Sequence, residues 1–218
     1  MANYMEEILD MKLEELLPII HKRLTSTKNH YLGIRTYRSP MDSWVYQQII
    51  WETKPDVLIE IGNKWGGSTL MFSHIIQNAG LSTRIIGVDK DHSILSKRAR
   101  EIPNSVFIEG DAVKSFDCVA NLIKPDEKVM IMDDSSHMYK ITLAILRKYH
   151  KLVTKGQYFI IEDGIGNNGL PKKKQPGYNA YKACEDFVKE CPEFKIHRSR
   201  ELFVITYNPK GYLLRIRE

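Results

Sequence analysis

Acidic side chains stand at or near the ends of five short apolar segments, where they could bind a polar ligand together. In open α/β sheets, ligands bind outside the carboxyl ends of the strands, so these positions matter most. An aspartate at such a position can instead cap the next helix or form a turn. Five segment ends with the same chemistry nevertheless favour a shared binding edge. The residues are Glu60, Asp89, Asp111, Asp133 with Asp134, and Glu162 with Asp163.

The glycine-rich segment at residues 60–69, EIGNKWGGST, comes close to two phosphate-binding patterns and fits neither. The GxxxxGK[ST] pattern requires a lysine that reaches the β- and γ-phosphates, and Ser68 occupies that position. The GxGxxG pattern requires a second glycine, so that the backbone can approach a pyrophosphate, and Lys64 occupies that position. The segment therefore predicts a ligand other than a nucleotide polyphosphate.

Two of the acids indicate the chemistry of that ligand. Asp89 follows Gly62 by 27 residues, close to where dinucleotide-binding folds place an acid that accepts hydrogen bonds from ribose hydroxyls. Asp111 could accept from an adenine amine. An adenosine without phosphates meets these requirements, and S-adenosylmethionine is such a ligand. Glu60 could balance the cationic amino-acid end of that ligand, or could instead pair with Lys64.

A second acidic group surrounds one histidine. Aspartate and glutamate oxygens without cysteine suit Mg²⁺, Ca²⁺ or Mn²⁺. Such an ion, bound to an acceptor hydroxyl, would stabilise its alkoxide, and a neutral histidine could take the proton. A helix N-cap at Ser135 or Ser136, with an incidental histidine, is the structural alternative. The group consists of Asp134, His137, Glu162 and Asp163.

Short β-branched apolar runs alternate with helical periods from residue 56 onward, which predicts a parallel sheet covered by helices on both faces. We expect parallel strands at residues 56–62, 84–90, 106–111, 128–134 and 157–163. We expect helices at residues 66–78, 92–101, 117–123, 139–153 and 178–190. Segments 194–199 and 202–208 flank a tight Arg-Glu turn and predict an antiparallel hairpin. The expected fold is α/β, with a doubly wound, mostly parallel, seven-stranded sheet of Rossmann-like type.

Residues 1–55 contain amphipathic and aromatic segments and predict a helical N-terminal prefix that packs on the sheet or covers its binding edge. No repeat or linker divides the chain, so we expect residues 1–218 to form a single domain with residues 56–218 as its Rossmann-like core. The N-terminus lacks the uniform apolar core of a signal peptide, and no segment is apolar for long enough to cross a membrane. We therefore expect a cytoplasmic protein.

The formal net charge of +5 and the pI near 8.9 fall short of the strongly basic character of a nucleic-acid-binding domain. Three cysteines without a CxxC pair argue against a disulfide framework and against a thiolate zinc site. The basic segment 171–177, PKKKQPG, is typical of a solvated turn, or could cover the site and steer an anionic substrate. We expect neither nucleic acid nor a membrane as partner, and the sequence leaves a homo-oligomer open.

Four segments of the chain resemble one protein family. They are YLGIRTYRSPMDSWVYQQIIWETKPDVLIEIGNKWGGST at 31–69, DDSSH at 133–137, IIEDG at 160–164 and FVITYNPKGYLLR at 203–215. The family is labelled cephalosporin hydroxylase and is similar to rhamnosyl O-methyltransferases and to metal-dependent O-methyltransferases of macrolide sugars. The resemblance extends from about residue 30 to the end. It implies the class I methyltransferase fold, S-adenosylmethionine and Mg²⁺ as cofactors, and a sugar hydroxyl as acceptor, with rhamnose on a glycan or natural product favoured.

The resemblance also implies roles for individual residues, with His137 as the general base. The chain differs from some relatives in Ser136, where an acid often stands, and in Asp133 beside Asp134, of which Asp134 is favoured as a ligand. The implied metal ligands are Asp134, Glu162 and Asp163. The implied cofactor contacts are Glu60, Gly62, Asn63, Ser68, Asp89, Asp111 and Asp134.

Three other functions are compatible with parts of the sequence. An iron oxygenase, which the family label suggests, needs two histidines and one carboxylate, and only His137 is placed to serve. A nucleic-acid methyltransferase would use segment 171–177 and the basic tail RIRE, but aromatic residues do not alternate with basic ones there. A binding module without catalysis would not need the acids and the histidine. We expect a metal-dependent O-methyltransferase that uses S-adenosylmethionine and acts on a sugar hydroxyl.

Overall fold

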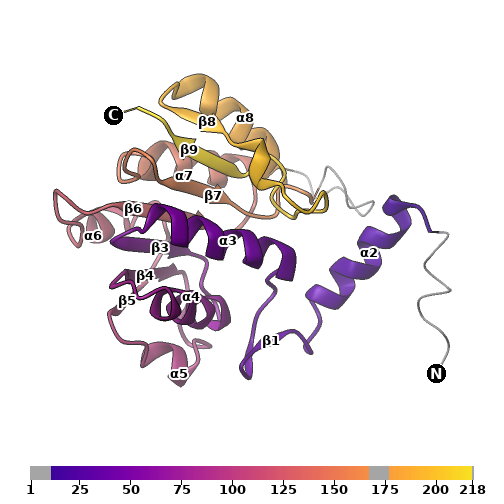
Figure 1. Cartoon of the computed structure of the whole chain (residues 1–218), viewed down its shortest axis with the longest axis horizontal. Coiled ribbons are helices and arrows are strands. Elements are labelled where there is room, and N and C mark those ends of the chain that lie inside the picture. Colours follow the sequence, from indigo (N-terminus) through magenta and orange to yellow (C-terminus); the bar gives the residue numbers. More distant parts are fainter. Residues whose placement is uncertain (1–10, 167–176, 218) are drawn as a thin grey trace.

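A seven-stranded sheet forms the centre of the computed structural model, which describes residues 11–166 and 177–217. The strands are β3 (Val57–Ile61), β4 (Arg84–Asp89), β5 (Ser105–Glu109), β6 (Val129–Asp133), β7 (Tyr158–Ile161), β8 (Phe194–Ile196) and β9 (Tyr212–Arg215). Their order across the sheet is β5-β4-β3-β6-β7-β9-β8 (Figure 1). β3 to β7 pair in parallel, and β9 runs antiparallel to both of its neighbours. The predicted doubly wound sheet with an antiparallel terminal hairpin is therefore confirmed.

The remaining elements cover the sheet or precede it. The helices are α2 (Leu13–Leu24), α3 (Pro40–Thr53), α4 (Gly67–Asn78), α5 (Lys97–Arg100), α6 (Phe116–Ala120), α7 (Tyr139–Tyr149) and α8 (Ala180–Glu190). A 3-10 turn, η1, spans Arg198–Arg200, and a two-stranded ribbon joins β1 (His30–Tyr31) to β2 (Ile34–Arg35). The ribbon was not predicted, and α5 and α6 are shorter than the helices expected there. Among the described residues, no helix is both long enough and apolar enough to cross a bilayer.

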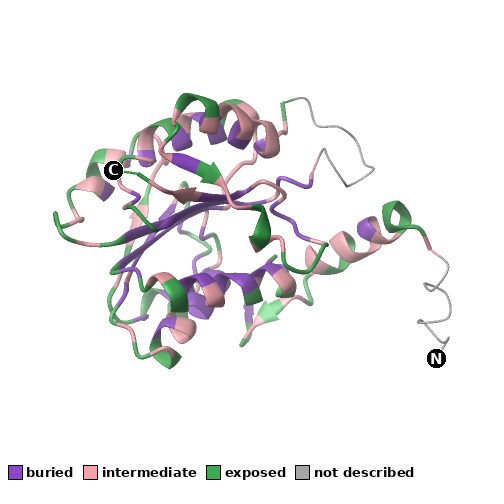
Figure 2. Cartoon of the chain, turned by 45° about the horizontal axis from the view of Figure 1, so that its top comes forward, coloured by how far each residue is buried: buried purple, intermediate pink, exposed green. Residues whose placement is uncertain are grey.

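Side chains that alternate along the strands bury both faces of the sheet. On one face Ile59 and Ile131 pack in a cluster with residues of α6, α7 and α8. On the other face Leu58 and Met130 pack in a cluster with residues of α3 and α4. Figure 2 shows the buried strands between these two helical layers. Because both faces are covered, a polar ligand can reach the sheet only at its edges or at its strand ends.

Helix α3 anchors the N-terminal prefix on the sheet. Pro40 occupies its first turn, and the Ser39 hydroxyl accepts the Asp42 backbone N–H at 3.4 Å, as a helix N-cap does. Tyr46 and Ile49 on this helix are fully buried against the sheet. Helix α2 stands apart from this body in Figure 1 and meets it through a small apolar cluster formed with the loops that follow β7 and η1.

The second strand of the terminal hairpin lies later in the chain than segment 202–208, where it was expected. That segment forms a loop in which Val204 is 88% exposed and has a φ of 64°. Asp42 of α3 accepts hydrogen bonds from the Thr206 hydroxyl and, at 3.0 Å, from the Tyr207 backbone N–H. The Tyr207 N–H, which a strand would use to pair with a neighbouring strand, thus donates to a side chain of the prefix. Strand β9 pairs with β7 and β8 instead.

The connections place a topological switch point between β3 and β6. The chain leaves β3 toward β4 and β5, and later returns to pair β6 on the other side of β3. The register sets Ile61 opposite Asp133, and the Asp134 N–H donates to the Ile61 carbonyl at 2.8 Å. Ligands of open α/β sheets bind at such a point. Gly62 and Asp134, the next residues of the two strands, therefore lie side by side at the expected binding edge.

Candidate active site

The glycine-rich turn after β3 is shaped by close backbone contacts. Gly62 has a φ of 91°, and a β-carbon there would lie 2.3 Å from the Asp134 carbonyl oxygen. No other residue type fits this position without moving the backbone. Further along the turn, the Lys64 N–H donates to Asp89 Oδ2 at 2.8 Å. The turn thus ties together the carboxyl ends of β3, β4 and β6.

A cavity of about 380 Å³ opens beside this turn, within the size range of small-molecule sites. Asp89 and Asp111 both line it, together with apolar side chains of β4, α7 and the loops between them. One oxygen of Asp111 also accepts the backbone N–H groups of Val113 and Lys114, at 3.1 and 3.2 Å. The predicted ribose and adenine acids therefore share one cavity, although Asp111 also has the turn-forming role that was its structural alternative.

A second cavity of about 170 Å³ lies on the other side of the turn. Gly62 and Asp134 line both cavities, so the two spaces meet at the switch point. His21, from α2, and Tyr207 close the outer side of the smaller cavity, and their rings stack with centres 6.1 Å apart. His137 and the carboxylates around it line the inner side.

Asp134, His137 and Asp163 converge at the inner side of the smaller cavity. His137 Nε2 lies 3.6 Å from Asp134 Oδ1 and 3.5 Å from Asp163 Oδ2. One potential ligand atom from each residue lies within 4.8 Å of the other two. Two carboxylate oxygens and one imidazole nitrogen at this spacing fit a divalent cation. This group contains a single histidine, so it lacks the pair that a non-haem iron oxygenase needs.

Local backbone geometry directs these side chains. His137 and Asp163 both have a φ of 55°, in the left-handed region that non-glycine residues seldom adopt. The His137 Nδ1–H can donate to the Glu162 carbonyl at 3.2 Å, which leaves Nε2 as the basic nitrogen facing the carboxylates. Asp133 points away from them, because its carboxylate accepts from the Ser135 N–H at 3.1 Å and is buried. Asp134, not Asp133, therefore faces the cavities.

Arg38 is a buried cation at this edge, and the sequence did not indicate its role. Its side chain is 3% exposed, and its guanidinium lies 3.2 Å from Glu60 Oε1 and 3.4 Å from Asp134 Oδ2. It also pairs with Glu162 Oε1. Burial raises the pKa of Asp134 to about 6, although the attraction of Arg38 and of His137 opposes this shift. The segment YRSP around Arg38 carries no signal of this role, because its partners lie far along the chain.

Glu60 makes its hydrogen bonds in the interior of the protein. It is fully buried and accepts hydrogen bonds from Arg38, from the Ser68 hydroxyl and, at 2.5 Å, from the Thr69 hydroxyl. Its partners do not include Lys64, which was the alternative considered for it. Glu60 is not among the residues that line either cavity. The prediction that it contacts a cofactor stays a prediction.

The other predicted residues are distributed over the two cavities. Asn63 and Ser68 line the smaller one, and Asn63 Oδ1 lies 3.1 Å from His92 Nε2. Glu162 also lines the smaller cavity, but its carboxylate pairs with Arg38 and is not part of the Asp134–His137–Asp163 group. The basic segment at 171–177 lies, apart from Gly177, outside the described residues.

Comparisons with known proteins identify the family of the chain. The chain matches the family model described as Rhamnosyl O-methyltransferase/CmcI over residues 23–216. It is 32% identical over 213 residues to the rhamnosyl O-methyltransferase of Mycobacterium tuberculosis strain H37Rv, which covers 94% of this chain and 86% of that protein. It is 31% identical over 193 residues to the rhamnosyl O-methyltransferase of Mycobacterium leprae, with 85% and 82% covered.

Solved structures show the same fold. One described as CmcI with Mg and SAM aligns with a TM-score of 0.67 and 20% identity, over 90% of this chain and 84% of that one. An O-methyltransferase from Bacillus cereus in complex with SAH aligns with a TM-score of 0.57 and 17% identity, over 88% and 86%. The chain therefore belongs to the rhamnosyl O-methyltransferase/CmcI family and has the class I methyltransferase fold.

Proposed function

We propose that the protein is an S-adenosylmethionine-dependent O-methyltransferase that methylates a sugar hydroxyl with the help of a divalent metal ion. The observation that carries this proposal is the meeting of two cavities at Gly62 and Asp134. One cavity has acids suited to an adenosine, and the other has carboxylates and a histidine suited to hydroxyl chemistry. The names of the mycobacterial relatives support a sugar acceptor, with a deoxysugar such as rhamnose favoured.

The larger cavity is the proposed cofactor site. Asp89 would accept from the ribose hydroxyls and Asp111 from the adenine amine, while the apolar walls would cover the base. Gly62 would let the cofactor pass close to the backbone at the junction of the cavities. S-adenosylmethionine, when bound, supplies a methyl group on a sulfonium. Asn63 and Ser68 would contact the amino-acid end of this cofactor, because both line the smaller cavity.

Asp134, Glu162 and Asp163 are the proposed metal ligands, and magnesium suits their oxygen donors. Asp134 and Asp163 lie in one group with His137, and Glu162 would contribute the oxygen that does not pair with Arg38. A divalent ion held there would act as a Lewis acid on the acceptor hydroxyl. Arg38 holds Glu60, Glu162 and Asp134 in one place and offsets their mutual repulsion.

His137 is the proposed general base. The bond from its Nδ1–H to the Glu162 carbonyl sets the tautomer in which Nε2 can accept a proton. The same nitrogen lies between Asp134 and Asp163, so it could serve instead as a metal ligand. The experiment below distinguishes these two roles.

We also propose that residues 1–55, of which the structure describes residues 11–55, form part of one domain with the core and cover the acceptor site. His21, Leu24 and Thr25 line the smaller cavity from the α2 side, which supports a covering role. The prefix also supplies Arg38 to the interior of the site. Removal of this segment would therefore open the acceptor cavity and leave three carboxylates without their cation.

The test compares His137→Ala with the exposed control His30→Ala. S-adenosylhomocysteine binding is measured by calorimetry, with NAD and ATP as competitors in separate runs, and methyl transfer is measured on a rhamnoside with Mg²⁺ or with a chelator. His137→Ala is expected to lower kcat by about 10²- to 10⁴-fold, the usual contribution of a general base, and to leave S-adenosylhomocysteine affinity nearly unchanged.

Mn²⁺ titration then assigns the role of His137. Unchanged Mn²⁺ affinity in His137→Ala would support the general base, and affinity lost by about 10-fold or more would make His137 a ligand. Binding of NAD or ATP in place of S-adenosylhomocysteine, or transfer that is unaffected by chelation, would contradict the proposed function.

A further inference from the structure

Two cations and two aromatic rings form a cluster at the smaller cavity, which we name the cationic rim: Arg35, Tyr37, Lys64 and Trp65. All four residues line that cavity. The guanidinium carbon of Arg35 lies 4.5 Å from the centre of the Trp65 ring, and Lys64 Nζ lies 4.2 Å from the same ring. Tyr37 meets Trp65 edge-on with ring centres 4.9 Å apart, and both cations also approach Tyr37. Two like charges are therefore held against one aromatic pair.

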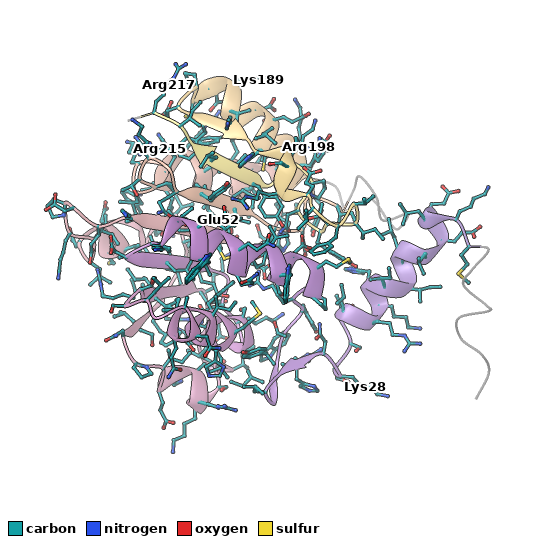
Figure 3. The ribbon with its side chains drawn as sticks, in the orientation of Figure 1. Lys28, Glu52, Lys189, Arg198, Arg215 and Arg217 are labelled. Carbon is teal, nitrogen blue, oxygen red and sulfur yellow. The ribbon has the colours of Figure 1, made fainter. Side chains whose placement is uncertain are left out.

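Within the part of the chain that the structure describes, neither Arg35 nor Lys64 makes an ion pair with a carboxylate. Arginines elsewhere do: Arg147 contacts Glu190 at 2.6 Å, and Glu52, labelled on α3 in Figure 3, binds Arg200. The acid near Lys64, Asp89, accepts its backbone N–H.

Arg35 has a further unused donor. Its Nε is buried and has no hydrogen-bond partner among the described residues, while one of its terminal nitrogens donates to the Tyr37 hydroxyl. A buried donor without an acceptor is costly, so its presence points to a ligand that supplies one. An anion that contacts Arg35 and Lys64 would offset the repulsion between the two like charges.

Acidic and basic side chains line different parts of the smaller cavity. Asp134 and Asp163 line it beside His137. The cationic rim lines it from the end of β2, from Tyr37 just after that strand, and from the glycine-rich turn. A neutral sugar needs only the hydroxyl-binding side. The rim adds attraction for an acceptor that presents a hydroxyl to the carboxylates and an anionic group to the cations.

We propose that the acceptor carries a phosphoryl group, as a sugar phosphate or a nucleoside-diphosphate sugar, and that Arg35 and Lys64 bind it. Arginine offers a planar fork that matches phosphate oxygens, and lysine adds a mobile point charge. Tyr37 and Trp65 hold both side chains in place and offer apolar contact to the sugar. This inference rests on the proposed function, because it names the class of acceptor for the same site.

The test uses a pair of lysines in matching surroundings. Lys64 has a φ of 43° and lies over Trp65, and Lys54 has a φ of 45° with its Nζ 5.6 Å from the ring centre of Trp51, outside the cavities. Lys64→Gln and Lys54→Gln therefore remove the same charge from similar backbone and aromatic settings. Arg35→Gln is the third variant.

Each variant is assayed for methyl transfer to methyl rhamnoside, rhamnose 1-phosphate and a nucleoside-diphosphate rhamnose. We expect kcat/KM to be higher for a phosphorylated acceptor than for the neutral one. Lys64→Gln and Arg35→Gln should each lower this preference by about 10-fold, as the loss of a charged contact does, while Lys54→Gln should not change it. Raising the salt concentration should lower the same preference. The two phosphorylated acceptors distinguish a single phosphate from a diphosphate.

The outcomes separate this inference from the proposed function. Equal transfer to the neutral and phosphorylated sugars, with no change in Lys64→Gln, would overturn the phosphoryl acceptor and leave the methyltransferase in place. If no sugar is methylated although S-adenosylhomocysteine binds, the sugar acceptor fails. Calorimetry of rhamnose 1-phosphate binding to the unmodified protein then tests, independently of methyl transfer, whether the cationic rim binds a phosphoryl group. Binding that Lys64→Gln weakens and Lys54→Gln does not would support it, and absence of binding would overturn it.

Discussion

Replacing Arg38 with methionine should destabilise the protein, because three carboxylates converge on this one buried cation. Methionine keeps the apolar stem of the side chain and removes the charge. Glu60 and Glu162 are 0% and 7% exposed, so water cannot replace the guanidinium at either. Asp134 is 28% exposed and can respond by binding a proton.

The size of the effect follows from this arrangement. Removing one partner of a buried ion pair costs about 3–5 kcal/mol. The lower end of that range is expected here, because Glu60 keeps its bonds to Ser68 and Thr69 and because the pKa of Asp134 is already about 6. A loss of about 3 kcal/mol corresponds to a decrease in Tm of roughly 6–12 °C for a chain of this length.

Urea unfolding at pH 7.5 with a chelator measures this loss, and Arg147→Met is the matched control. Arg147 makes two hydrogen bonds to Glu190, but the two side chains are 55% and 41% exposed, so the control should lose much less stability than Arg38→Met. Adding Glu162→Gln to Arg38→Met should restore part of the stability, since it removes one unpaired charge. Equal stability of the Arg38→Met and Arg147→Met proteins would refute the reasoning that Arg38 neutralises this edge.

Two further predictions concern the neighbouring backbone and the pH response. Gly62→Ala should lower stability by about 2 kcal/mol or more and abolish S-adenosylhomocysteine binding, because a β-carbon would meet the Asp134 carbonyl at 2.3 Å. Gly80→Ala is the control for backbone strain alone, because Gly80 has a φ of 66° and no atom lies within 4 Å of the added carbon. If urea unfolding shows the same loss of stability in both variants, the contact with the Asp134 carbonyl does not cause the loss in Gly62→Ala. In the folded protein without metal, the pKa of Asp134 is about 6, against an ordinary value of 3.8. Between these two pH values the folded state therefore binds a proton that the unfolded state has lost. The contribution of Asp134 to the free energy of unfolding falls as the pH rises from about 4 to about 6. Asp134→Asn should remove that decline from urea unfolding measured between pH 4 and 7, and an unchanged pH profile would show that Asp134 does not titrate in this range.

The sheet could be predicted because its information is local. The segments that became β3 to β7 are short and mostly apolar, and a helical segment separates each strand from the next. Gly62 was identifiable from the turn in which it lies. The acids at the strand ends were identifiable for the same reason, since parallel strands of one sheet share a carboxyl edge.

The local sequence pattern gave a wrong or incomplete prediction where contacts between distant parts of the chain determine the structure. Segment 202–208 has the composition of a strand, yet its backbone bonds to Asp42 of the prefix and it forms a loop. Arg38 carries no local signal, and only the packing of α3 on the sheet brings it to the carboxylates. Likewise, the direction of the acids at β6 depends on the turn, which buries Asp133 and leaves Asp134 in the cavities.

The amino-acid sequence by itself determined the order of the five parallel strands and of the helices between them, the edge of the sheet at which a ligand would bind, and the kinds of side chain gathered there. The tertiary structure decided which of those side chains face a cavity, which are neutralised by Arg38, and which residues of the prefix line the smaller cavity. The physical reason is that periodicity and turn propensity act over a few residues. Charge neutralisation and cavity shape depend instead on groups that only the folded chain brings within a few ångströms of one another.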